Sequence, residues 1–227
     1  HTPVVQMEDR IRTIMMPHFS DFYPTLMPAV LARSGYKVEV LPTADTQSAE
    51  IGLIYANNEI CYPATVVIGD LVKDLLAGKY NLNETAVCIT QTGGQCRATN
   101  YVPILKKAIV DAGITTVPVI STAFSGGFVN EQPGFKLILR KLIMPAFNGI
   151  LFGDAIANMC YSVAPRELEA GSAKNLRDHY INLATQTFET KSKPDLKGIL
   201  QEAVQAFNQV PCVNSKLPVI GVVGEIF

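Results

Sequence analysis

The sequence lacks an excess of charge of either sign. Its 19 Lys and Arg residues balance 20 Asp and Glu residues, which leaves a formal net charge of -1. Proteins that bind nucleic acid or anionic membranes through phosphate groups usually carry a surplus of positive charge. Neither nucleic acid nor a membrane surface is therefore expected as a partner.

A long uninterrupted apolar run is also missing. The longest candidate, residues 138–152, is interrupted by Arg140, Lys141, Pro145 and Asn148. A membrane-spanning helix needs about 20 predominantly apolar residues. The first residues also lack the basic stretch and apolar stretch of a secretory signal. We therefore expect no membrane span.

Closely spaced cysteines are absent. The five cysteines stand at positions 61, 88, 96, 160 and 212, and no two of them form a CxxC motif. This spacing excludes the common zinc-ribbon and thioredoxin patterns, and it differs from the disulfide framework of a small secreted protein. A reducing cytoplasm is the expected location. Because GxSxG and HExxH motifs are missing too, the sequence gives no support to a hydrolase.

Apolar strand patterns alternate with helical patterns in the first half of the chain. Strands are predicted over 12–17, 36–41, 85–90 and 115–121, and helices over 20–34, 61–78 and 99–112. Because parallel strands need crossover connections, this alternation predicts an α/β fold with a doubly wound, mainly parallel sheet of flavodoxin or Rossmann type. Further helices are predicted over 134–158, 166–190 and 195–209, so the C-terminal half is expected to be rich in helix.

These patterns divide the chain into three expected parts. They are an α/β parallel-sheet domain over 10–125, a helical extension packed on it over 126–216, and the start of a following α/β unit over 217–227. The last part contains LPVIGVVG, an apolar strand pattern. We therefore expect the sequence to be part of a longer polypeptide.

The loop at 57–63 (NNEICYP) carries the first candidate site residue. Cys61 stands at the first turn of a predicted helix, where unpaired backbone N–H groups and the helix dipole favour a thiolate. A thiolate at such a position can bind a soft metal or an iron-sulfur cluster. A small buried residue beneath the loop is the alternative interpretation, since free cysteine is among the most buried residue types.

The loop at 91–101 (QTGGQCRATNY) carries the second set of candidates. Gly93 and Gly94 precede a helix start and can form a nest of backbone N–H donors for a phosphate or for cluster sulfurs. Arg97 adds positive charge beside Cys96, which favours its thiolate form. An ordinary turn between a strand and a helix is the alternative. Both loops are expected at the carboxyl ends of strands, where open α/β sheets bind ligands.

Cys61 and Cys96 occupy comparable positions in the predicted fold and can converge in space. An iron-sulfur site built from loops that are distant in the sequence is therefore one interpretation of this pair. Cys160 lies near the end of a predicted helix and faces either the same crevice or the core. Cys88 lies within a predicted strand and is expected in the core.

Four segments together resemble a known family: NNEICYPA at 57–64, QTGGQCRATNY at 91–101, GDAIANMCYSVAPRELEAG at 153–171 and GVVGEIF at 221–227. The chain resembles the 2-hydroxyacyl-CoA dehydratase superfamily. It is most similar to the dehydratase-like portion of CoA-substrate-specific enzyme activases, also called acyl-CoA dehydratase activase-related proteins. The CYPA loop is the most specific element. Gln95 and Asn100 depart from the Gly-Pro-Cys-Arg and Gln-Tyr forms that are usual in the family.

The resemblance implies a four-iron four-sulfur (4Fe-4S) cluster and low-potential electron transfer linked to 2-hydroxyacyl-CoA dehydration. Cys61 and Cys96 match cluster-ligand positions, and Cys160 is a candidate third metal ligand. A fourth would come from outside this sequence, since such a cluster normally takes three or four thiolates.

The resemblance also gives roles to the residues around the cluster. The amides of Gly93 and Gly94 would tune its potential through hydrogen bonds, and Arg97 would offset its negative charge. The implied partners are other domains of the same polypeptide, including an actin-like ATPase domain, and an acyl-CoA dehydratase. The ATPase phosphate loops are not found in this sequence, so no ATPase activity is assigned to it. A homodimer and catalytic activity of the chain itself are left open.

Two alternatives of other classes remain. The first is a non-catalytic α/β scaffold or small-ligand binding module that has lost the chemistry. The second is a thiol-redox module that uses a Cys61–Cys96 disulfide. The position of Cys61 relative to Cys96 in the fold discriminates, because two thiols far apart favour the scaffold.

Overall fold

The computed structural model describes residues 1–57, 59–92, 96–123, 130–136, 139–190, 195–214, 217–221 and 223. These residues form two compact units, each treated by itself below. The sheet unit comprises residues 1–18 and 35–137, and the helical unit comprises 19–34 and 138–223. The expected domain over 10–125 is thus interrupted, because residues 19–34 belong to the helical unit.

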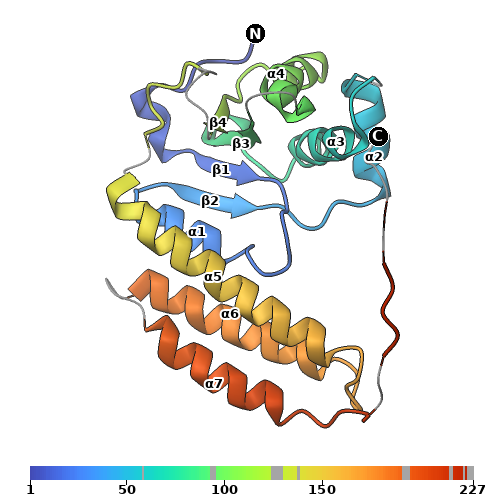
Figure 1. Ribbon diagram of the computed structural model, residues 1–227. Coiled ribbons are helices and arrows are strands. Elements are labelled where there is room, and N and C mark those ends of the chain that lie inside the picture. The colour runs from blue at the N-terminus through green and yellow to red at the C-terminus, as the bar shows by residue number, and fades with distance from the viewer. Residues whose placement is uncertain are drawn as a thin grey trace. The chain divides into compact units, whose positions relative to one another are not determined.

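The sheet has four parallel strands (Figure 1). They are β1 (Thr13–Met16), β2 (Lys37–Val40), β3 (Thr85–Gln91) and β4 (Val119–Ala123). Their spatial order is β2-β1-β3-β4, so the chain winds outward from β1 in one direction to β2 and in the other to β3 and β4. This order confirms the predicted doubly wound α/β fold.

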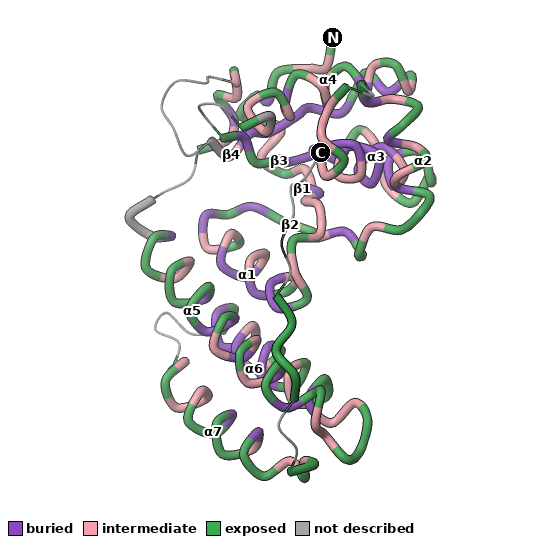
Figure 2. Tube along the Cα trace, turned by 45° about the vertical axis from the view of Figure 1, so that its right-hand side comes forward, coloured by how far each residue is buried: buried purple, intermediate pink, exposed green. Residues whose placement is uncertain are grey.

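The strands divide their side chains between two apolar clusters, as the alternation of a pleated strand requires. Met15, Val87 and Ile89 point to the cluster that helices α3 and α4, described below, cover. Their neighbours Ile14 and Cys88 point to the opposite cluster. Strands buried on both faces lack a polar side, which is why β3 reads as a nearly continuous apolar run. Figure 2 shows β3 largely buried.

The sheet unit contains three α-helices and three short 3-10 helices. They are α2 (Thr46–Tyr55), α3 (Tyr62–Leu76), α4 (Tyr101–Asp111), η1 (Met7–Ile11), η2 (Leu82–Glu84) and η3 (Arg97–Asn100). Helices α3 and α4 confirm predicted elements. Helix α2 was not predicted, because its apolar residues are spread around the helix and produce no amphipathic period.

Helices α2 and α3 form a tightly packed hairpin around two glycines. A Cβ atom on Gly52 would lie 2.0 Å from the carbonyl oxygen of Thr65, and one on Gly69 would lie 1.9 Å from that of Ser48. Only residues without a side chain allow this approach of the two backbones. The hairpin therefore fixes the loop between the helices, which contains Cys61.

The helical unit confirms the prediction of a helix-rich C-terminal half. It contains α1 (Leu26–Ala32), α5 (Leu139–Val163), α6 (Ser172–Thr190) and α7 (Leu196–Asn208) (Figure 1). Its core includes Leu26 of α1, Phe152 and Ile156 of α5, and Phe188 of α6. The hydroxyl of Tyr23 donates a hydrogen bond of 2.5 Å to the Asp154 carboxylate and so joins the segment before α1 to α5.

Helix α5 extends beyond the apolar run considered above. Among the described residues, one helix is long and apolar enough to cross a membrane, judged by length and composition alone. It is the segment Leu142–Val163 of α5. The helix was predicted over 134–158, and α5 begins at Leu139 and ends at Val163. Within the helical unit α5 packs against α1, α6 and α7.

The predicted strand at 217–224 does not form among the residues of that segment that the structure describes, which are 217–221 and 223. Val219 is 97% exposed there. An apolar strand pattern needs a neighbouring strand for its backbone hydrogen bonds and a core for its side chains. The described part of this segment has no strand partner, so the pattern alone does not make it a strand.

Candidate thiol site

Cys61 lies in the loop between α2 and α3 and is the N-cap of α3. Asn57 shapes this loop, because its side-chain oxygen accepts a hydrogen bond from the Glu59 N–H and its carbonyl accepts one from the Ile60 N–H. The Cys61 carbonyl begins the helix by accepting from Ala64, while its thiol makes no capping bond. The thiol is partly exposed and free to face another group.

The location of Cys61 differs from the expectation in one respect. Its loop follows helix α2 and not a strand. The crossover helix α3 nevertheless runs back toward the start of β3, so its first residue lies at the carboxyl edge of the parallel sheet. Cys61 therefore lies at the predicted edge, but it follows a helix there and not a strand.

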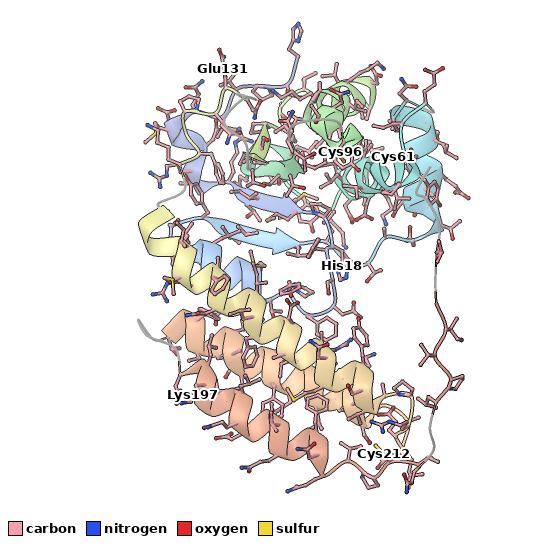
Figure 3. The ribbon with its side chains drawn as sticks, viewed as in Figure 1. His18, Cys61, Cys96, Glu131, Lys197 and Cys212 are labelled. Carbon is pink, nitrogen blue, oxygen red and sulfur yellow. The ribbon has the colours of Figure 1, made fainter. Side chains whose placement is uncertain are left out.

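Cys96 lies after β3 and is the N-cap of η3, whose Thr99 N–H donates to the Cys96 carbonyl. Its side chain is exposed and free. Helix α4 begins directly after η3, at Tyr101. Cys96 thus belongs to the same carboxyl edge of the sheet (Figure 3).

Tyr101 contacts Cys61 and follows Cys96 by five positions in the chain. Its hydroxyl oxygen lies 3.6 Å from the sulfur of Cys61, within hydrogen-bond range for sulfur. Burial raises the pKa of the Tyr101 phenol, and the contact with Cys61 and the charges that Cys61 and Cys96 can carry raise it further. Cys96 stands on the same turn, because η3 leads from it directly into Tyr101. We call Cys61, Cys96 and Tyr101 the thiol site.

A buried polar network supports the Cys96 side of the thiol site. The Gln91 side chain, at the end of β3, donates a hydrogen bond of 2.5 Å to the Thr99 carbonyl and accepts one from the Ser121 hydroxyl of β4. The Gln132 amide in turn pairs with both the N–H and the carbonyl of Ser121. The turn that begins at Cys96 is therefore tied to β3 and β4 by satisfied buried groups, which restrict its motion.

The other three cysteines have different surroundings. Cys88 is in the core of the sheet unit, as expected, and burial raises the pKa of its thiol to about 12. Cys160 belongs to the helical unit, where it is buried and donates a weak hydrogen bond to the Ala173 carbonyl. Burial raises the pKa of Cys160 as well. Cys212 pairs with Glu167 in an isolated antiparallel bridge.

The remaining predicted site residues are only partly covered by the described structure. Gly93 and Gly94 lie outside the described residues. The backbone of Arg97 opens η3, while its side chain is not described. The proposed roles of these three residues therefore rest on the sequence.

The described residues contain no group of three or more His, Cys, Asp or Glu side chains that could hold a metal ion. The thiol site offers two thiols and one phenol. Thiolates are soft ligands and nucleophiles, and a phenol donates hydrogen bonds to them. This set can supply part of the coordination of a soft metal centre, or form a disulfide.

Sequence reasoning missed Tyr101 and Gln91 as members or supports of the site. Tyr101 ends the quoted motif, and its place at the first turn of the predicted helix was the available signal. Gln91 is a polar residue that closes a buried apolar strand, and such a residue usually has buried partners.

The chain matches no family model, no curated protein and no solved structure.

Proposed function

We propose that the sheet unit contributes Cys61 and Cys96 as ligands to an iron-sulfur cluster. The cluster would serve low-potential electron transfer linked to 2-hydroxyacyl-CoA dehydration. The observation that carries the proposal is the contact between the Cys61 sulfur and the hydroxyl of Tyr101, the residue that directly follows the η3 turn begun by Cys96, although the two cysteines are 35 positions apart in the chain.

The chemistry of the donor set fits two ligand positions of such a cluster. Both sulfurs are accessible and neither is in a disulfide, whereas Cys88 is sealed in the core. Both cysteines are also N-caps whose thiols make no capping bond, which leaves the sulfurs available. A bound cluster would supply one-electron transfer at a potential set by its surroundings.

The chain's own residues hold and orient these ligands. The glycine contact between α2 and α3 fixes the backbone before Cys61. The Gln91 hydrogen bonds fix the turn after Cys96. Two ligands held on separate rigid supports lose little conformational entropy when a metal centre binds between them.

The two thiolates leave ligand positions to be filled, because cysteine-bound clusters take three or four thiolates. In the proposal these come from a partner of the dehydratase system or from other parts of the same polypeptide. In solution a small thiol can take their place. The test therefore adds iron, sulfide and a small thiol to the protein without oxygen.

The expected result is a protein that retains iron and inorganic sulfide and absorbs in the visible range. Cys61→Ala and Cys96→Ala should each lose most of the iron. Cys212→Ala is the matched control, since Cys212 is partly exposed like Cys61 but lies in the helical unit, and it should retain iron like the wild type. A folded wild-type protein without iron would reject the proposal in favour of the scaffold or binding module.

A disulfide between Cys61 and Cys96 is a second candidate, since both thiols are free and both residues are at least partly exposed. It predicts a reversible Cys61–Cys96 crosslink on mild oxidation, detected as a linked peptide pair by mass spectrometry. Iron retention that does not depend on either cysteine, together with that crosslink, would favour this function over the cluster.

A further inference from the structure

The hydroxyl group of Tyr101 is not needed for the packing of its ring in the fold. Its ring packs against the apolar cluster of the sheet unit, and this accounts for its bulk. Its hydroxyl group lies 3.6 Å from the Cys61 sulfur. Phe in its place would fill the same space, so the hydroxyl points to a role at the thiol site.

We propose that Tyr101 is a third functional residue of the thiol site, which donates a hydrogen bond from its hydroxyl group to the sulfur of Cys61. The inference rests on the proposed function, since it assigns to the phenol the task of tuning a metal-bound cysteine.

The direction of the hydrogen bond follows from the chemistry of the two groups. A cysteine that binds a metal does so as a thiolate, which has no proton to donate. The phenol has one proton and can donate it. With Cys61 as a ligand, the tyrosine must therefore be the donor and the sulfur the acceptor.

The effect of this bond is to withdraw electron density from the ligand sulfur. Hydrogen bonds to the sulfurs are among the factors that set the reduction potential of a cluster, because they stabilise the more negative reduced state. Tyr101 should thus raise the potential of the bound centre. Helix α4 holds the ring in place, so the donor is pre-organised before any metal binds.

The test compares the wild type with Tyr101→Phe after reconstitution with iron, sulfide and a small thiol. The variant keeps the ring and removes only the donor. We expect unchanged iron content and a midpoint potential shifted to a more negative value. Tyr80→Phe is the matched control, because the Tyr80 hydroxyl donates to Glu39 and not to a cysteine, and its potential should equal that of the wild type.

A second measurement needs no metal. In the reduced, metal-free protein, the infrared S–H stretching band of Cys61, assigned as the band missing in Cys61→Ser, should change frequency in Tyr101→Phe and not in Tyr80→Phe. Incorporation of 3-fluorotyrosine at position 101 provides a stronger donor. It should shift the potential in the direction opposite to Tyr101→Phe.

The outcomes separate the two proposals. A potential and an S–H band that are both the same in wild type and Tyr101→Phe would overturn the role of Tyr101 and leave the cluster proposal standing. A wild-type protein that takes up no iron would overturn the cluster and, with it, the tuning role. The S–H band would then still decide whether the contact between Tyr101 and Cys61 exists.

Discussion

At the scale of single residues, the five cysteines differ in environment far more than their identical chemistry implies. Cys96 is exposed and Cys61 partly exposed, whereas Cys88 is only 2% exposed. Burial penalises a charged thiolate, and this is why burial raises the pKa of Cys88 to about 12. Reactivity and metal binding both require the thiolate, so they are confined to the accessible cysteines.

This contrast predicts selective alkylation. At pH 8 a thiol with a pKa of about 12 is roughly 10⁻⁴ ionised, and Cys88 is also shielded from reagents. Iodoacetamide should label Cys96 rapidly in the folded protein and leave Cys88 unlabelled until urea unfolds the chain. Peptide mapping by mass spectrometry provides the measurement. Equal labelling of both cysteines under native conditions would contradict the assigned burial.

A second residue-scale prediction concerns Gln91. Gln91→Leu removes the partner of the Thr99 carbonyl and of the Ser121 hydroxyl. Loss of partners for buried polar groups costs about 1–3 kcal/mol, so the free energy of unfolding should fall by that amount. Alkylation of Cys96 should also accelerate, because its turn is released. Gln201→Leu, at an exposed position of α7, is the control and should change neither quantity.

At the scale of elements, the α2–α3 hairpin depends on close backbone contact. Gly69→Ala would place a Cβ atom 1.9 Å from the Ser48 carbonyl oxygen, and backbone atoms cannot move aside as a flexible side chain can. We expect the free energy of unfolding to fall by about 1–3 kcal/mol. Gly149→Ala is the control. Its nearest neighbour would be a side-chain atom at 3.7 Å, and alanine favours the helix. Equal stability of Gly69→Ala and wild type in urea denaturation would disprove the contact.

The N-terminus of α2 gives a prediction on pH. The Ser48 N–H donates to the Asp45 carboxylate, and Lys73 donates to it as well. Together they lower the pKa of Asp45 from 3.8 to about 2. A carboxyl group with a lowered pKa in the folded state stabilises the protein above its unfolded pKa and loses this effect as the pH falls through the folded pKa.

Asp45→Asn keeps a good capping residue and removes this titration. The free energy of unfolding of the wild type relative to the variant should therefore be constant above a pH of about 4. It should decline as the pH falls from about 4 toward about 2. Urea denaturation at a series of pH values measures the difference. A difference that stays constant over that range would show that Asp45 is not held by these hydrogen bonds.

Elements with a strong period were predictable from the sequence, and the exceptions have physical causes. Helices α3, α4, α6 and α7 present apolar faces or clear end signals, and β3 is a buried apolar run. Helix α2 shows no such face and was missed. The strand predicted at 115–121 begins only at Val119, after Pro118, which cannot donate a ladder hydrogen bond.

At the scale of the whole molecule, local pattern could not reveal how the chain divides. The helix after β1 was assigned to the sheet domain by the logic of a βαβ unit, yet residues 19–34 cluster with α5 and α6. That grouping depends on contacts such as Thr25 with Thr185, which are far apart in sequence. The candidate site was partly predictable, because its signals lie in short stretches of sequence. Cysteines at helix starts are visible locally, and parallel-sheet topology brings helix starts to one edge.

The central claim is that Cys61 and Cys96 form one site. Dibromobimane tests it most directly, because this short reagent becomes strongly fluorescent when both of its bromomethyl groups have reacted with thiols. The account predicts fluorescence in the folded, reduced wild type and in Cys212→Ala, and its loss in Cys61→Ala and in Cys96→Ala. Fluorescence that persists in either of these two variants, or none in the wild type, would contradict the convergence of the two thiols.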